Sequence, residues 1–284
     1  MLDLLKYNKN ISNRINININ DYIEYSEKYS SIEIEIKPKD NNHGKFINFK
    51  NEDEKYYHIY FNNNKEEIRR NYLNSNEDIK IIKIKIDYQV ESFERLFENC
   101  NCIESIHFKK FSRNNIQNMS FMFSGCSSLK ELNVNNFKTT NTTSMYAMFN
   151  KCSLLKELNV NNFNTTNVIN MSAMFNKCSS LTELNVNNFN TTNVTNMSAM
   201  FSDCSSLKEL NVNNFNTINL KYVIGMFHKC SSLKELNLNN FSKSNITDMD
   251  FMFSECSNEL ITQIKTQYKN IKDEAFKKID CLIY

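Results

Sequence analysis

The chain has 284 residues, which is long enough for two domains or for one elongated array. Its 40% hydrophobic and 23% charged residues are typical of a folded protein and exclude a disordered one. The formal net charge of +2 provides no global field that would recruit nucleic acid or an acidic membrane surface.

The N-terminus shows no signal-peptide pattern. Asp3 interrupts the short apolar run of residues 1–6, which is far below the length of a signal-peptide core. No later stretch approaches the roughly 18 apolar residues that a membrane span requires. We therefore expect a cytoplasmic protein without membrane insertion.

Residues 1–78 have α+β character and contain no internal repeat. The sequence predicts strands over residues 31–36 and 57–61 and a short helix over residues 65–70. Residues 79–86 predict a strand that joins this region to the rest of the chain. The region is either a cap or a small domain with its own role.

Residues 79–257 repeat with a 26-residue period. The period is carried by columns of identical residue types, of which two are Cys100, Cys126, Cys152, Cys178, Cys204, Cys230, Cys256 and Phe123, Phe149, Phe175, Phe201, Phe227, Phe253. One copy buries too little apolar surface to offset the entropy lost when 26 residues become ordered. The copies must therefore stack on one another.

Each repeat contains two different periodicities. Met197, Met200, Phe201 and Cys204 fall at i, i+3, i+4 and i+7, which predicts a short helix. Residues 207–215 alternate apolar and polar side chains, which predicts a short strand. The expected fold class is an α/β repeat solenoid, leucine-rich-repeat-like, with one short helix and one short strand of a parallel sheet in each copy.

Residues 258–284 predict a C-terminal capping helix. Ile264, Tyr268 and Ile271 have the spacing of an amphipathic helix that lies across the last repeat.

The repeated cysteines have three interpretations. They close the apolar stripe of each predicted helix, which favours packing as small hydrophobic residues. A ladder of thiols about 5 Å apart also allows disulfides or a soft metal. Cys100 and Cys102 are the only close pair, and no C-x-x-C motif or Cys/His array accompanies them. We therefore expect no metal and no cofactor.

Catalytic motifs are not apparent in the sequence. The 4 histidines lie in no nucleophile or metallohydrolase pattern, and the 3 glycines are too isolated for a phosphate-binding loop. We expect that the protein is not an enzyme.

The outward side of the predicted strands is the candidate partner-binding surface. Its residues are Glu131, Asn133, Glu157, Asn159, Glu183, Asn185, Glu209 and Asn211. Asparagines stacked in this way can also bond to one another along the ladder, so their repetition has a structural interpretation too. Nearly identical rows encode little information, which suits a repetitive protein partner, multivalent binding or self-association.

The first copy departs from the later ones in a basic direction. His107, Lys109 and Lys110 replace asparagine-type positions, and Arg113 lies nearby. This basic patch is either a solvated edge or interdomain contact, or a site for an acidic partner. In the fifth copy, residues 221–225 replace the usual Thr-Asn-Met-Ser-Ala, which we interpret as drift.

Two rival functions follow from the Thr-rich and Asn-rich turns. A flat threonine array would suit ice binding, but Ile218 and Ser244 break the column, which argues against it. Glycosylation acceptors would suit a secreted protein, but repeats rich in Asn and Thr generate them by accident. These acceptors are Asn141, Asn164, Asn190, Asn193 and Asn196.

The block over residues 193–210, Asn-Val-Thr-Asn-Met-Ser-x-Met-Phe-x-x-Cys-Ser-Ser-Leu-Lys-Glu-Leu, closely resembles the BspA-like leucine-rich repeats. These repeats occur in mycoplasma surface lipoproteins and in many protist proteins, and the resemblance covers roughly residues 90–257. It implies a solenoid used for protein binding or adhesion, without enzymatic chemistry. We therefore predict a non-enzymatic protein-binding scaffold, with a secreted or cell-surface adhesin as the alternative.

Overall fold

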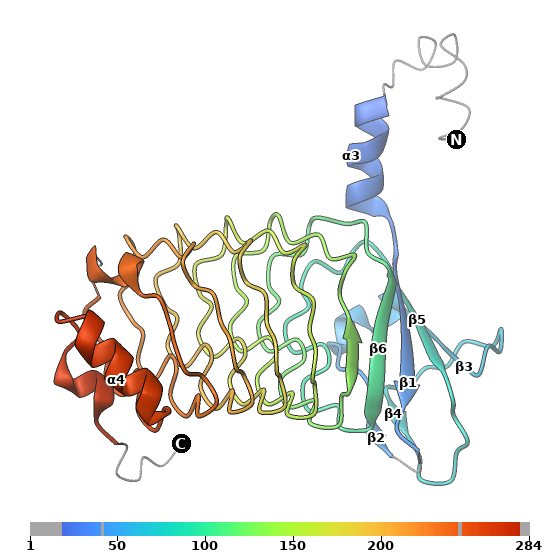
Figure 1. Ribbon diagram of the computed structural model, residues 1–284. Helices are drawn as coiled ribbons and strands as arrows, with labels where there is room; N and C mark the ends of the chain where they lie inside the picture. Colours follow the sequence, from blue (N-terminus) through green and yellow to red (C-terminus); the bar gives the residue numbers. More distant parts are fainter. Residues whose placement is uncertain (1–18, 41–42, 244–245, 279–284) are drawn as a thin grey trace.

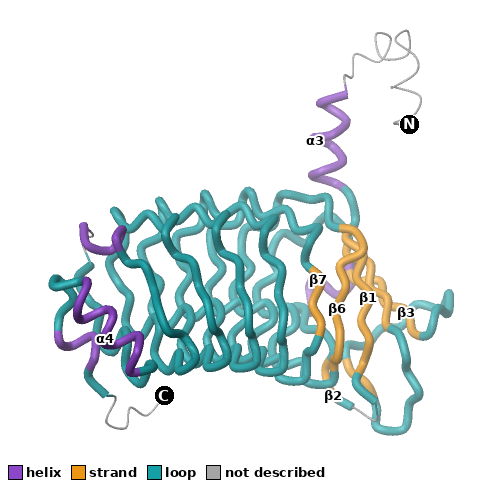
Figure 2. The backbone as a smooth tube through the Cα atoms, in the orientation of Figure 1, coloured by secondary structure: helices purple, strands orange, loops and turns teal. Residues whose placement is uncertain are grey.

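The computed structural model describes residues 19–40, 43–243 and 246–278. Figures 1 and 2 show an elongated array of similar turns with a sheet at one end and a helix at the other. The elements are α3 (Ile19–Tyr29), β1 (Ile32–Pro38), β2 (Gly44–Lys45), a 3₁₀ helix (Asn51–Tyr56), β3 (Tyr57–Phe61), β4 (Tyr72–Leu73), β5 (Ile82–Ile86), β6 (Ile103–Lys110), β7 (Glu131–Asn133), a 3₁₀ helix (Asn239–Lys243), α4 (Asn258–Gln267) and a 3₁₀ helix (Asp273–Phe276).

The N-terminal strands continue directly into the first repeat. The larger sheet has the order β3-β5-β1-β6-β7, with β1 antiparallel to both β5 and β6 and β6 parallel to β7. The strands predicted at 31–36, 57–61 and 79–86 correspond to β1, β3 and β5. Ile82, Ile84 and Ile86 of β5 are buried, and they alternate with two exposed lysines at positions 83 and 85. Their side chains belong to the same hydrophobic core as the repeats, so this region closes the first edge of the array.

The helix predicted over residues 65–70 is wrong. Ile68 lies in extended backbone, and its N–H donates to the carbonyl oxygen of Ile59 at 2.8 Å. Arg70 lies over the ring of Phe61, 5.1 Å from its centroid, and pairs with Glu77. The segment therefore covers the outer edge of β3, where an extended backbone satisfies groups that a helix would leave unpaired.

Successive 26-residue copies lie side by side in register. The ring of Phe201 is 5.7 Å from the rings of both Phe175 and Phe227, with interplanar angles of 4° and 7°. The same stack continues through Phe253 to Phe276, beyond the last copy. Parallel bridges join the copies at Ser92–Asn118, Asn118–Ser144, Ser144–Asn170, Asn170–Asn196, Asn196–Tyr222 and Tyr222–Asp248.

The short helix predicted in each repeat is wrong, because the segment around Met197–Cys204 is a series of turns. Alternate amides bond within the copy, as Met200 N–H does to Met197 O at 3.1 Å. The amides between them bond to the next copy, as Ala199 N–H does to Ile224 O at 2.8 Å. Ala199 itself has a φ of 54°. The neighbouring copy thus satisfies the donors that a helix would satisfy internally.

The parallel sheet of many strands is also wrong in extent. Among the extended segments of the described residues, only β6 and β7 of successive copies pair as strands, and the later copies are joined by the single bridges of their turn segments. Later copies keep the predicted alternation, since Leu210 and Val212 are buried between exposed neighbours. Their backbones meet less closely, as in the 3.5 Å contact from Lys208 N–H to Thr182 O. An asparagine turn ends each extended segment, because Asn213 N–H donates to Asn211 Oδ1 at 3.0 Å.

The C-terminal helix is shorter than predicted. α4 ends at Gln267, and its N-cap is Ser257, whose hydroxyl accepts the Leu260 N–H at 3.1 Å. Gln263 bonds both backbone groups of Leu236, at 3.1 and 2.9 Å. The following 3₁₀ helix accepts a backbone bond from Phe253 at Ala275 O, at 2.8 Å. These two elements cover the last copy, while residues 279–284 lie outside the described part.

In the described ranges, no helix combines the length and apolar character needed to cross a membrane.

Candidate functional site

Two outer surfaces run along the array. We call "extended face" the outward side chains of residues 130–136 and of the equivalent positions 156–162, 182–188, 208–214 and 234–240. We call "turn face" the outward side chains of residues 120–125 and of the equivalent positions up to 250–255. Phe108 of β6 contacts Phe123 from the turn segment with centroids 6.2 Å apart, so the core lies between the two faces. The two faces therefore lie on different sides of the core.

The predicted glutamates all lie on the extended face and are exposed. Glu131 contacts His107, with 3.0 Å between Oε1 and Nε2. Glu157, Glu183 and Glu209 form no ion pair within the described part of the chain. Three carboxylates in successive copies are thus available to a partner.

The asparagines of the extended face are largely engaged with the backbone. Asn133 and its equivalents Asn159, Asn185 and Asn211 each accept, at Oδ1, the N–H of the residue two positions later at 3.0–3.1 Å. In the neighbouring column, Asn188 Nδ2 donates to Asn161 O of the previous copy at 2.9 Å. The repetition of asparagine is therefore structural, but the bonds run from side chain to backbone instead of from side chain to side chain.

The residues of the predicted basic patch do not form one exposed cluster. His107 faces Glu131, and Lys109 pairs with Glu35 of β1 at 3.2 Å. Lys110 is exposed.

The surface position predicted for Arg113 is wrong, because this side chain is fully buried. Its Nη1 donates to the carbonyl oxygens of Asp87 and Val90, both at 3.0 Å. Burial lowers the pKa of Arg113 to about 10. The residue occupies the inward column that holds Thr139 in the next copy, so it points toward the junction after β5 and holds that junction in place.

The repeated cysteines are buried and unpaired, which confirms the packing interpretation for those that the structure describes. Cys204 Sγ donates to the carbonyl oxygen of Phe175 at 3.1 Å, and burial raises its pKa well above the ordinary value. Among the described residues, no group of three or more His, Cys, Asp or Glu side chains is placed to hold a metal ion.

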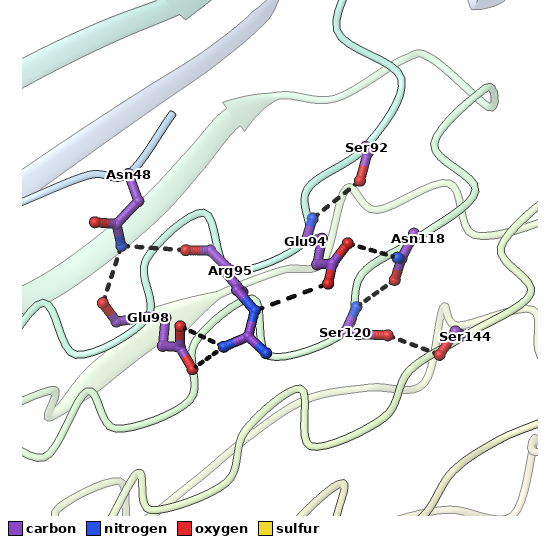
Figure 3. Close-up of polar contacts among 8 residues, drawn as sticks. All are labelled: Asn48, Ser92, Glu94, Arg95, Glu98, Asn118, Ser120 and Ser144. Carbon is purple, nitrogen blue, oxygen red and sulfur yellow. Dashed lines mark hydrogen bonds and ion pairs between the residues drawn. The ribbon is translucent and has the colours of Figure 1, made fainter. Parts of the chain in front are cut away.

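The first copy begins with a network of ion pairs and hydrogen bonds among its own charged residues and neighbouring polar groups (Figure 3). Arg95 Nη1 contacts both carboxylate oxygens of Glu98 at 2.8 Å. Asn48 Nδ2 donates to the backbone oxygens of Arg95 and Glu98 at 3.1 and 2.9 Å. Glu94 accepts from Asn118 Nδ2 at 3.2 Å. This network covers the first end of the array. Most of its charged and polar side chains already have a partner within it.

A family model described as a Mycoplasma protein of unknown function, DUF285, matches residues 91–184 and again residues 143–265. Together the two matches span more than half of the chain. The chain belongs to the DUF285 family. No significant match was found among curated proteins or among solved structures.

In this DUF285 chain, the part that matches the family holds both outer faces, whereas β1, β3 and β5 lie before it. The family description assigns no activity, so the function has to be argued from the surfaces themselves.

Sequence reasoning missed a groove on the turn face of the DUF285 chain. It encloses about 720 Å³ and is lined by side chains from Phe121 to Glu255. Ile224 and Gly225, which we interpreted as drift, line it. The small residues that form its floor recur visibly in the sequence. We did not expect a groove there because we interpreted these segments as short helices.

Proposed function

We propose that this protein is a non-enzymatic recognition scaffold, a leucine-rich-repeat-like solenoid of the BspA-like type that binds a protein partner through its extended face. The observation that carries the proposal is the row of unpaired carboxylates of Glu157, Glu183 and Glu209 on a backbone whose register is fixed by stacked cores. Side chains held at a regular spacing on a rigid support recognise a partner with little loss of entropy on binding.

The polar composition of this face favours a protein partner over a small molecule. The hollow between the first two rows is lined by Lys130, Glu131, Asn133, Lys156 and Glu157, with Leu132 and Leu158 at its base. It is a shallow depression instead of an enclosed apolar pocket of the kind that holds a small ligand. Charged side chains at such a surface set specificity and association rate more than affinity.

The binding proposal is tested by affinity capture from the source organism. The bait pair is the wild-type chain and a Glu157→Lys/Glu183→Lys/Glu209→Lys variant, and a Lys138→Glu/Lys221→Glu variant, which changes two exposed lysines outside both faces, is the control. We expect proteins bound by the wild type and by the control to be depleted about tenfold or more with the extended-face variant. Identical capture by all three baits would contradict the proposal.

The solenoid proposal is tested by deletions that keep or break the register. Removing residues 171–196 joins Asn170 to Met197, which restores a normal repeat boundary, so we expect a folded chain with cooperative unfolding. Removing residues 171–183 deletes half a period, and we expect loss of cooperative unfolding. Equal behaviour of the two deletions in urea titrations would contradict the solenoid.

The cytoplasmic location and the adhesin alternative are separated by fractionation of native cells with a mass measurement of the product. Asn193 Nδ2 donates to Thr166 O at 2.8 Å, so a glycan on this nitrogen would have to be accommodated against the preceding copy. We therefore propose an unglycosylated cytoplasmic product, and a glycosylated product at the cell surface would support the adhesin instead.

A further inference from the structure

The groove on the turn face has a regular floor. Its floor column consists of Phe121, Ala147, Ala173, Ala199, Gly225 and Phe251, one residue from each of six successive copies. All six have φ values between 52° and 58°, so the backbone is the same at each position. The hollow exists because the four central side chains are a methyl group or a hydrogen, whereas a phenyl ring stands at each end.

The two ends and two sides of the groove differ in chemistry. At the first end, the ring of Phe121 meets Tyr146 edge to face, with centroids 4.7 Å apart. One side is formed by Tyr146, Ser198 and Ile224. The other side is formed by a polar row and, outside it, a charged row, namely Asn150, Asn176, Ser202, His228 and Lys151, Lys177, Asp203, Lys229.

Charge is distributed unevenly along the groove. Lys151 and Lys177, in the half next to Phe121, are exposed and form no ion pair within the described residues. In the other half, Lys229 lies 3.7 Å from Glu255, and Asp203 adds a further carboxylate. The first half is therefore positively charged, and the second half is neutral to negative.

The backbone of the floor offers no edge for strand addition. Ala147 N–H donates to Ser172 O at 2.9 Å, and Ala147 O accepts from Asn150 N–H at 3.1 Å. The same pattern recurs at Ala173 and Ala199. Because these amides and carbonyls are engaged, an occupant has to be recognised by side chains and by packing.

We propose that this groove binds an extended segment of a partner polypeptide, with acidic residues over Lys151 and Lys177 and apolar or basic residues toward Phe251. Five steps of about 4.8 Å separate the terminal rings, which gives roughly 24 Å. An extended peptide of about seven residues covers that length. The carboxylates of Asp203 and Glu255 disfavour a uniformly anionic chain such as a nucleic acid. This site is independent of the extended face.

The floor column supplies a blocking variant that the fold already accommodates. Ala173→Phe and Ala199→Phe place a phenyl ring at φ 54°, and Phe121 and Phe251 occupy the same column at 57° and 58°. We expect the variants to fold and to fill the groove. Circular dichroism and urea unfolding check that they do.

The test is a screen of the full chain against a heptapeptide library that varies the charge of each position, followed by fluorescence anisotropy with the best labelled peptide. We expect saturable binding of peptides acidic at one end, weakened about tenfold or more by Ala173→Phe and by Lys151→Glu/Lys177→Glu. The matched control is Lys138→Glu/Lys221→Glu, which makes the same charge change at two exposed lysines outside both faces and should bind as the wild type does.

Three outcomes would overturn the proposal. The first is the absence of saturable binding to any peptide of the library. The second is unchanged affinity in a folded Ala173→Phe variant. The third is preferential binding of a labelled single-stranded oligonucleotide, tested at the same ionic strength, over the best peptide.

Discussion

Cys178 Sγ donates to the carbonyl oxygen of Phe149, 29 residues earlier, at a distance of 3.1 Å. The same bond joins Cys126 to Phe97 and Cys256 to Phe227, both at 2.9 Å. Each thiol therefore satisfies a carbonyl oxygen of the preceding copy from inside the core. A thiol is small and apolar enough for the core and can still donate this bond, which explains why cysteine recurs at this position.

Alkaline pH should destabilise the fold through these thiols. Burial raises the pKa of Cys178 to about 12, whereas the thiol of an unfolded chain has a pKa of about 8.5. The folded pKa is the higher one, so the stabilisation is complete below the unfolded pKa and is lost as pH rises above it. Each buried thiol should lower the unfolding free energy by about 1.4 kcal/mol per pH unit there. Urea unfolding at pH values between about 8.5 and 10 measures this slope. Cys178→Ala should reduce the pH dependence of the unfolding free energy by the contribution of one thiol. An unchanged slope would contradict the burial of Cys178.

His58 should stabilise the N-terminal sheet most strongly at acidic pH. Its Nε2 lies 3.0 Å from Asp87 and its Nδ1 3.3 Å from Glu67. The bond to Asp87 is the main cause that raises the pKa of His58 above its ordinary value, followed by burial, which opposes it, and by Glu67. This stabilisation is complete below the unfolded pKa and is lost as pH rises through the folded one. An NMR titration should give a His58 pKa above about 6.5, lowered by Asp87→Asn. No change in that variant would refute the contact.

The stacked rings should dominate the stability of each repeat. Phe201 is fully buried between two parallel rings, so Phe201→Ala should cost about 3–5 kcal/mol by opening a cavity. Ile218 is 61% exposed, and Ile218→Ala serves as the control with an expected change within about 0.5 kcal/mol. Chemical denaturation measures both, and a Phe201→Ala protein as stable as the control would mean that the ring does not lie in the core.

Arg113 should behave as a buried structural residue instead of a surface cation. Arg113→Ala removes the two bonds to Asp87 O and Val90 O and leaves a cavity, so we expect a loss of about 2–4 kcal/mol. The matched control is Lys110→Ala, which changes an exposed residue of the same predicted patch and should cost less than about 0.5 kcal/mol. Equal effects in urea titrations would place both residues at the surface.

Several errors of sequence interpretation have one cause. The spacing of Met197, Met200 and Phe201 is the same for a helix and for a series of turns that faces one core, so the pattern alone does not distinguish them. What distinguishes them is the partner of each amide, and Ala199 N–H finds its partner in the next copy. Similarly, nothing local to Arg113 shows that its donors meet two carbonyl oxygens more than twenty residues away.

The sequence by itself determined the 26-residue period, the inward columns and the exposure of Glu157 and its equivalents, because burial of apolar side chains depends on residue type and spacing. Only the tertiary structure decided the turn backbone, the insertion of β1 between β5 and β6, and the groove over Ala173 and its neighbours. These features depend on hydrogen bonds between copies and on the relative sizes of equivalent side chains in successive copies. A single repeat, read alone, contains neither.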